Sequence, residues 1–410
     1  MSLEIGSVHR MLTVPRAIPR TVWVLGFVSL FMDISSEMIH ALLPIYLVTV
    51  LGASTVTVGL IEGIAEATAA ITKIFSGVLS DRLGKRKALV VLGYGMAAFT
   101  KPVFPLASNI GLLVVARFVD RTGKGIRGAP RDALIADVTP PELRGASFGL
   151  RQSLDTIGAF IGPLAAIGLM LLSNDQFKLI FWIAVIPAFI SFGLLIVGVE
   201  EPKSHQDHLR AALRLADAKR LRRPYWILVV FVALLTLARC SEAFLILRAL
   251  NVGLPAALVP LILVVMNIFY ALAAFPAGLA SDRFGRNGVL VLGISFLIVA
   301  DILLASGLSI VIVMLGVVFW GLHMGFSQGI FAAVLADIVP ADLRGSAFGF
   351  FNLVSGLAML AASLMAGLIW DVSGPAATFV ASAGVTSAAL LVFVFTGRNF
   401  NPLRVNDAAR

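Results

Sequence analysis

The sequence predicts an all-α membrane protein with twelve transmembrane helices, arranged as two six-helix bundles related by pseudo-symmetry. Three observations lead to this fold class. The 410 residues are 59% hydrophobic, and the apolar residues are gathered in long runs. Lys and Arg are concentrated in alternate loops, and two sequence motifs recur about 200 residues apart.

The apolar runs define the expected spans. About 20 apolar residues cross a bilayer core of roughly 30 Å, and in lipid every backbone polar group needs a partner inside the protein, which favours helices. The expected spans are residues 21–50, 55–79, 88–106, 109–136, 144–171, 177–199, 224–248, 256–280, 288–306, 308–336, 344–370 and 375–397.

The distribution of charge predicts the orientation. Basic residues occupy the loops at 80–88, 139–144, 200–223, 281–287 and 339–344 and both tails, whereas loops such as 51–54 and 306–309 are nearly uncharged. Because basic loops stay inside, we expect both termini in the cytoplasm and a location in a plasma membrane, such as a bacterial inner membrane. The net charge of +9 is therefore explained by topology and lipid head groups, and we expect no nucleic-acid partner.

The recurring motifs indicate a tandem duplication. "GVLSDRLGKRK" begins at Gly77 and "GLASDRFGRNG" at Gly278, while "ALIADVTPPELRGASFG" begins at Ala133 and "AVLADIVPADLRGSAFG" at Ala333. Each half then holds six spans in the same orientation. The predicted domains are an N-terminal bundle at 1–199, a cytoplasmic amphipathic linker at 200–223 and a C-terminal bundle at 224–410.

With these motifs, the sequence resembles the major facilitator superfamily of transporters over nearly its whole length. "GVLSDRLGKRK" is similar to the loop signature between the second and third spans of that family. "GAFIGP" at 158–163 resembles the fifth-span signature of its proton-coupled exporters. The resemblance implies the fold of that family and transport by alternating access.

Gating residues are expected where the spans meet these loops. The Asp81 carboxylate can accept hydrogen bonds from a helix N-terminus or an arginine, and such contacts would break and re-form as the halves rock. The gating candidates are Asp81, Arg82, Arg86, Asp282, Arg283, Arg131 and Asp137. Asn287 stands where the first half has Arg86 or Lys87, so we expect a weaker contact in the second half. For Lys85 and Lys87, the alternative is that they only keep the loop inside.

The fourth span carries a stripe of charge. In "ARFVDRTGKGIRGAPRDALIAD", residues 116–137, the charged side chains from Arg117 to Asp132 fall within roughly 140° on a helix. Its basic residues Arg117, Arg121, Lys124 and Arg127 are candidate substrate or cavity residues. The second half has Val317, Gly321, Met324 and Ser327 at the corresponding positions, so the fold itself does not require the stripe.

Acidic residues on neighbouring spans are the expected partners of the stripe. Unpaired charges are too costly inside a bilayer, and the charged residues selected on the first, second, fourth and fifth spans comprise seven acids and seven bases. At about 1.5 Å per helical residue, Lys124 should lie level with Asp33 and Asp155, and Arg117 and Arg121 should lie level with Glu62 and Glu66. The proton-coupling candidates are Asp33, Glu37, Glu62, Glu66, Asp120 and Asp155. Three interpretations stay open: a network that only packs helices, a proton-coupling and gating network, and an anion site.

The second half carries scattered polar groups that suit the binding of an apolar solute. Its substrate or cavity candidates are Arg239, Glu242, Trp320, His323, Gln328 and Asn352. Met266 and Met324 are interpreted as core residues rather than as binding residues.

We therefore expect a secondary transporter that moves a small solute by alternating access, with protons driving its export. The alternatives are uptake or exchange of an organic anion, and a membrane sensor or lipid-handling protein that transports nothing. No enzyme motif is present, and we expect no catalytic residue, metal or cofactor. The expected partners are a small-molecule substrate, protons and the lipid bilayer, with the chain acting as a monomer.

Overall fold

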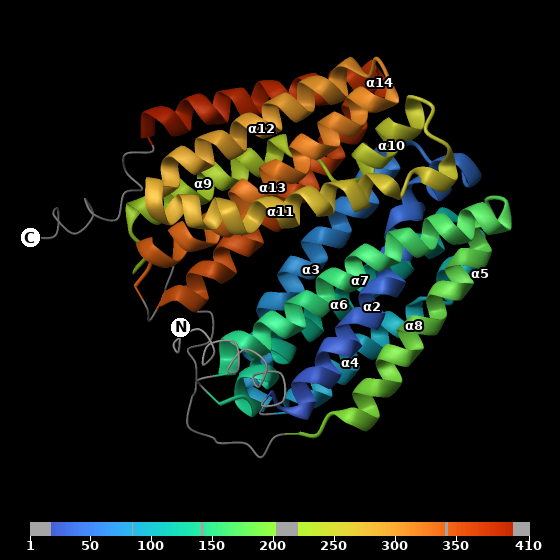
Figure 1. Cartoon of the computed structure of the whole chain (residues 1–410), viewed down its shortest axis with the longest axis vertical. Helices are drawn as coiled ribbons and strands as arrows, with labels where there is room; N and C mark the ends of the chain where they lie inside the picture. The colour runs from blue at the N-terminus through green and yellow to red at the C-terminus, as the bar shows by residue number, and fades with distance from the viewer. Residues whose placement is uncertain (1–17, 84, 141–142, 202–219, 341–342, 397–410) are drawn as a thin grey trace, which may run out of the picture. The chain divides into compact units, whose positions relative to one another are not determined.

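The computed structural model describes residues 18–83, 85–140, 143–201, 220–340 and 343–396 (Figure 1). These residues form helices joined by short turns. The first half holds α2 (Arg20–Ile45) with its π-helical extension η1 (Tyr46–Val50), α3 (Thr55–Leu83), α4 (Arg86–Thr100), α5 (Val103–Leu106), α6 (Ile110–Val138), α7 (Arg144–Ser173) and α8 (Phe177–Gly198). The second half holds α9 (Arg223–Ala238), α10 (Ala243–Asn251), η4 (Ala256–Leu258), α11 (Leu261–Phe284), α12 (Arg286–Ser306), α13 (Ile310–Ile338) and α14 (Arg344–Thr396).

The predicted helical fold is confirmed, and every predicted span falls largely on helix. The predicted spans 88–106, 224–248 and 256–280 are each interrupted by a few non-helical residues. Gly374 has φ 86° and ψ 171°, which is not helical, so α14 divides there into the last two predicted spans. Among the described residues, nine helical segments are long and apolar enough to cross a membrane. The charged helices α3 and α6 are not among these nine segments, and α14 is counted as a single segment although it contains two predicted spans. The number of twelve spans therefore stays a prediction.

The helices group into two compact units. Unit 1 comprises residues 1–40 and 72–210, and unit 2 comprises residues 41–71 and 211–410. The repeat alone predicts a boundary in the linker at 200–223, of which 202–219 lie outside the described residues. The grouping differs from the predicted halves in one respect, because residues 41–71 pack with the C-terminal residues.

Unit 1 is built on close helix approaches. Helix α4 packs against α6 and α8, and α6 and α8 each pack against α7. A Cβ added at Gly93 would lie 2.6 Å from the carbonyl oxygen of Gly123, so only glycine lets α4 and α6 approach this closely. Gly158 and Gly162, from the "GAFIGP" motif, bring α7 equally close to the backbone of α2. This packing aligns the charged face of α6 with α2, α4 and α7.

Unit 2 combines the C-terminal helices with the first part of α3. Helix α9 packs on α14, and α13 packs on both α11 and α12. A side chain at Gly59 would overlap the carbonyl oxygen of Ser363, and one at Gly63 would lie within 2.9 Å of Leu360 Cα. The spacing of Gly59 and Gly63 is the small-residue pattern that lets membrane helices pack backbone to backbone. At the start of α3, the Asp371 carboxylate accepts hydrogen bonds from the backbone N–H groups of Thr55 and Val56.

Candidate functional site

A cavity of about 420 Å³ lies within unit 2, between α3, α9, α13 and α14. Its wall is largely aromatic and aliphatic, with Leu235, Phe331, Phe348, Phe351 and Met359 among its residues. Polar groups interrupt this wall at Glu66, Thr236, Arg239, His323, Ser327, Gln328, Asn352 and Ser355. Such a mixture suits a small solute with an apolar body and a few polar groups.

The cavity gathers several of the predicted residues. Four substrate candidates line it: Arg239, His323, Gln328 and Asn352. Glu66, a proton-coupling candidate, lies in the same wall. Trp320 is 1% exposed and belongs to the core rather than to the cavity lining. Glu242 also lies outside the lining, but it is an electrostatic neighbour of Arg239.

A break in the seventh predicted span positions Arg239. Helix α9 ends at Ala238 and α10 begins at Ala243, so Arg239 follows directly on the last turn of a helix. Glu66 and Glu242 both interact favourably with its guanidinium. Non-helical backbone inside a membrane span is tolerated where it is buried in protein or lines a cavity. The break thus places Arg239 in the cavity wall, with the carboxylates of Glu66 on α3 and Glu242 as its electrostatic neighbours.

His323 is fixed in one orientation. Its Nδ1 lies 2.8 Å from the carbonyl oxygen of Gly293, and the residue is 1% exposed. A carbonyl can only accept, so Nδ1 carries the proton and Nε2 remains as an acceptor in the neutral ring. One turn further along α13, the Ser327 hydroxyl donates to the carbonyl of His323 at 2.7 Å.

In unit 1, the charged face of α6 is paired with groups from the neighbouring helices. Lys101 Nζ lies 2.9 Å from Asp120 Oδ1 and donates to Ser36 Oγ at 3.0 Å. The side chains of Lys101 and Asp120 are 1% and 6% exposed, which makes this a buried ion pair. Sequence reasoning missed Lys101, although the signal was present as a lone lysine inside the apolar run 88–106.

A second cluster surrounds Arg131. Its Nη1 donates to Ser29 Oγ at 2.9 Å and to the Tyr94 hydroxyl at 3.3 Å, and lies 3.8 Å from Asp155 Oδ1. Arg151 Nη1 lies 3.4 Å from Asp155 Oδ2. Predicted as a gating residue, Arg131 thus lies in a network of α2, α4 and α7 groups. Nearby, the Arg127 guanidinium stacks 4.5 Å from the centre of the Tyr94 ring.

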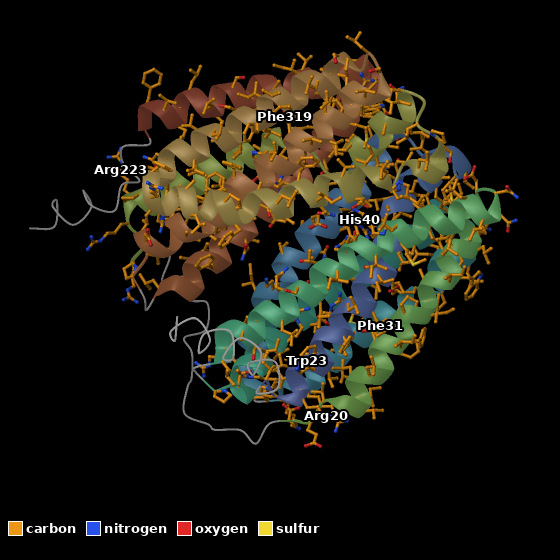
Figure 2. All side chains as sticks on the ribbon, in the orientation of Figure 1. Arg20, Trp23, Phe31, His40, Arg223 and Phe319 are labelled. Atoms are coloured by element: carbon orange, nitrogen blue, oxygen red, sulfur yellow. The ribbon has the colours of Figure 1, made fainter. Side chains whose placement is uncertain are left out.

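The carboxyl groups of Asp33 and Asp155 lie beside these cations. They are electrostatic neighbours of one another, and Lys124 interacts favourably with both. The neighbours predicted for Lys124 from helical depth are therefore its neighbours in the structure. His40, labelled on α2 in Figure 2, lies one turn from Glu37, and its Nδ1 is 3.4 Å from Glu37 Oε2.

The remaining predicted residues divide between the two units. Arg117 and Arg121 are buried in unit 1, next to Asp120. Glu62 is 1% exposed and belongs to unit 2, as does Glu66. The level match predicted between these arginines and glutamates therefore joins residues of different units and stays a prediction.

An ion pair recurs at the same place in both halves. Arg86, the first residue of α4, pairs with Asp137 near the end of α6 and also donates to the carbonyl of Ala133 at 2.8 Å. Arg286, the first residue of α12, pairs in the same way with Asp337. The expectation of a weaker contact at Asn287 is therefore wrong, because Arg286 takes the place of Arg86.

Three other gating candidates have side chains outside those that the structure describes: Asp81, Arg82 and Asp282. Arg283 is exposed, and its guanidinium lies 5.3 Å from the ring centre of Phe284.

The helical fold, the nine described segments able to cross a membrane and the cavity in unit 2 are features of a multi-pass membrane transporter. The model of the Major Facilitator Superfamily matches residues 25–247 and 241–410. The chain therefore belongs to the Major Facilitator Superfamily.

Relatives and solved structures agree with this assignment. An uncharacterized MFS-type transporter of Methanocaldococcus jannaschii is 32% identical over 387 residues, which is 92% of this chain and 96% of that protein. The gentisate transporter of Corynebacterium glutamicum is 25% identical, and the match covers 77% of this chain and 73% of that protein. The quinolone resistance protein NorA of Staphylococcus aureus is 23% identical, and the match covers 53% of this chain and 54% of that protein. The crystal structure of the nucleoside transporter NupG has a similar fold, with a TM-score of 0.77 at 15% identity, covering 91% of this chain and 98% of that one.

Proposed function

We propose that this superfamily member is a secondary transporter that uses protons to drive the export of a small solute by alternating access. The observation that carries the proposal is the electrostatic interaction of the Asp33 and Asp155 carboxyl groups among the cations of α6. Two neighbouring carboxylates repel one another, which favours a state in which one of them carries a proton, so the pair is a place where a proton can be held and released.

The cations around this pair connect the proton to a change of structure. Lys124 interacts with both carboxyl groups, and Asp155 also contacts Arg131 and Arg151. Loss of the shared proton would add a negative charge among these cations and strengthen their contacts with the pair. A ligand that binds one arrangement better than another shifts the equilibrium between them, and here the proton is that ligand.

The unit 2 cavity is the proposed substrate site. Its aromatic wall would bind the apolar part of the solute, and Arg239, Glu66 and Gln328 would orient its polar groups. Export is favoured by the "GAFIGP" resemblance and by the similarity to the quinolone resistance protein NorA. The proposal retains the predicted bundles 1–199 and 224–410, with cytoplasmic termini and one chain as the transporting species.

Flux measurements on reconstituted protein test this function. Proteoliposomes would be loaded with gentisate or a quinolone, the solutes named for two relatives, and exposed to an imposed pH gradient. We expect Asp33→Asn to abolish pH-driven flux. Asp175→Asn, in an exposed turn, is the matched control and should leave it unchanged. Intact pH-driven flux in both Asp33→Asn and Glu37→Gln would refute proton coupling through α2.

A second candidate function is uptake or exchange of an organic anion. Arg239 at the cavity favours it, because a guanidinium binds a carboxylate with two parallel hydrogen bonds. The similarity to a gentisate transporter points the same way. Gentisate exchange without a pH gradient, which Arg239→Ala abolishes, would support this function. pH-driven quinolone flux that Arg239→Ala leaves unchanged would argue against it.

A further inference from the structure

Asp301 is a buried carboxyl group outside both the cavity lining and the charge network of α6. It lies on α12, is 0% exposed, and its Oδ2 is 2.5 Å from the hydroxyl oxygen of Ser382 on α14. The same hydroxyl oxygen lies 2.5 Å from the carbonyl oxygen of Ala238, the last residue of α9. Three oxygen atoms thus form a short chain inside unit 2.

Hydrogen-bond counting assigns a proton to this chain. A serine hydroxyl has one hydrogen to donate, and a backbone carbonyl can only accept. If Asp301 were ionised, one of the two contacts of Ser382 would bring two oxygens together without a proton between them. If Asp301 is protonated, its Oδ2–H donates to Ser382 and Ser382 donates to Ala238. Both contacts are then hydrogen bonds.

The internal repeat supports the same protonation state. Helices α4 and α12 begin 200 residues apart, so Asp301 occupies the position of Lys101 in the first half. Lys101 pairs with Asp120, whereas the corresponding position in the second half is the apolar Trp320. Among the described residues, no cation forms an ion pair with Asp301. An unpaired carboxylate buried in this way is costly, whereas a neutral acid is not.

The titratable groups on the surrounding elements have other partners, apart from one thiol. Cys240, in the break between α9 and α10, is an electrostatic neighbour of Asp301. Arg248 of α10 donates to the carbonyl of Leu304 at 2.8 Å, His323 of α13 bonds Gly293, and Tyr270 of α11 donates to Gln328 at 3.4 Å.

We propose that Asp301 is a proton-binding site, and that its bound proton holds, through Ser382, the helix break that carries Arg239 to the cavity. On deprotonation, the proton on Oδ2 passes to water and the carboxylate keeps the electron pair. Ser382 then donates its hydrogen to Asp301, and the Ala238 carbonyl loses that donor. The end of α9 is thereby released next to Arg239. As a site for the driving proton, Asp301 rests on the proposed function.

Access to this site fits the predicted direction of the driving proton. Asp301 lies five residues before the end of α12 at Ser306 and far from Arg286, at the other end of the helix. The loop before Arg286 is one of the basic loops predicted to be cytoplasmic. A proton that enters from the outside would therefore meet Asp301 early, about 8 Å from the end of the helix at 1.5 Å per residue.

Infrared difference spectroscopy of the full chain in liposomes tests the site without a transported solute. We expect C=O stretching bands of protonated carboxyl groups in the wild type. One of these bands should decrease as the pH is raised and be absent in Asp301→Asn, whereas the contribution of the Asp33–Asp155 pair should remain. Ser382→Ala should shift the band to the frequency of a weaker hydrogen bond. Ser387→Ala is the matched control and should not shift it, because the Ser387 hydroxyl donates within its own helix to the carbonyl of Ala383.

The outcomes separate this site from the proposed function. A spectrum in which Asp301→Asn removes no band, or removes one that never titrates, overturns the proton-binding site. Where the wild type moves gentisate or a quinolone, we expect Asp301→Asn to lower pH-driven flux about tenfold, the rate equivalent of one lost hydrogen bond. Undiminished pH-driven flux in this variant would overturn its role in coupling. If the wild type shows no pH-driven flux, the proposed function fails, while the infrared titration still decides whether Asp301 binds a proton.

Discussion

Removal of either partner of the buried Lys101–Asp120 ion pair should destabilise the protein, but by unequal amounts. Breaking a buried pair by removing one partner typically costs about 3–5 kcal/mol, because the other charge remains buried and uncompensated. The Nζ–Oδ1 distance of 2.9 Å and the near-complete burial of both side chains place this pair in that class.

The neighbours of the pair determine which change costs more. Asp120 also has Arg117 and Arg121 as favourable neighbours, so Lys101→Met leaves a carboxylate that is still compensated. Lys101 has Arg117 and Arg127 as unfavourable neighbours, so Asp120→Leu leaves an ammonium group among like charges with Ser36 as its remaining hydrogen-bond partner. We expect Asp120→Leu to lower the free energy of unfolding by about 4–5 kcal/mol, and Lys101→Met to lower it by no more than about 3 kcal/mol.

Denaturant unfolding of the purified protein, followed by tryptophan fluorescence, would measure both values. The double variant Lys101→Met/Asp120→Leu removes both charges and should be more stable than Asp120→Leu alone. Asp175→Asn serves as the exposed control. A larger loss for Lys101→Met than for Asp120→Leu would refute the assignment of the surrounding charges.

Three further changes test other contacts. Arg286→Gln and Arg86→Gln should reduce transport to a similar extent in a flux assay, since each breaks the same ion pair in its own half; an effect of Arg86→Gln alone would contradict the equivalence. Gly59→Ala should destabilise the protein by about 1–3 kcal/mol in thermal unfolding, because a Cβ there overlaps backbone. Gly278→Ala should leave thermal unfolding unchanged, because the space around this glycine is open. Asp371→Ala should cost about 1 kcal/mol through loss of the α3 cap, and unchanged hydrogen exchange at the start of α3 would argue against that cap.

The helices, and the neighbours of Lys124 in the charge network, could be predicted from the sequence because both follow from local spacing. Apolar run lengths located the spans, and helical depth brought Lys124 to Asp33 and Asp155. The role of Lys101 was not predicted, because a single lysine in an apolar run forms no periodic pattern. Its partner Asp120 lies on another helix, so helical spacing does not connect the two residues. The protonation of Asp301 depends on Ser382, a contact between residues 81 positions apart that spacing does not reveal.

The error at Asn287 has a simple geometric origin. The loop motif repeats at an offset of 201 residues, whereas the following motif repeats at 200, so the second half is one residue shorter between the two motifs. Because α4 and α12 begin 200 residues apart, the missing residue belongs to the loop before α12, and Arg286 is the first residue of that helix. The packing of residues 41–71 with the C-terminal residues is a tertiary arrangement to which the repeat gives no clue.

The lone cysteine of the chain turns the helix break into a ready-made reporter. Cys240 is 3% exposed and lies two residues beyond Ala238. The carbonyl of Ala238 accepts a hydrogen bond from the hydroxyl of Ser382. Because the sequence has no second thiol, the rate of modification by a maleimide measures the opening of this one segment in the unmodified protein. Chemical labelling can therefore follow the break through a transport cycle without a cysteine-free background.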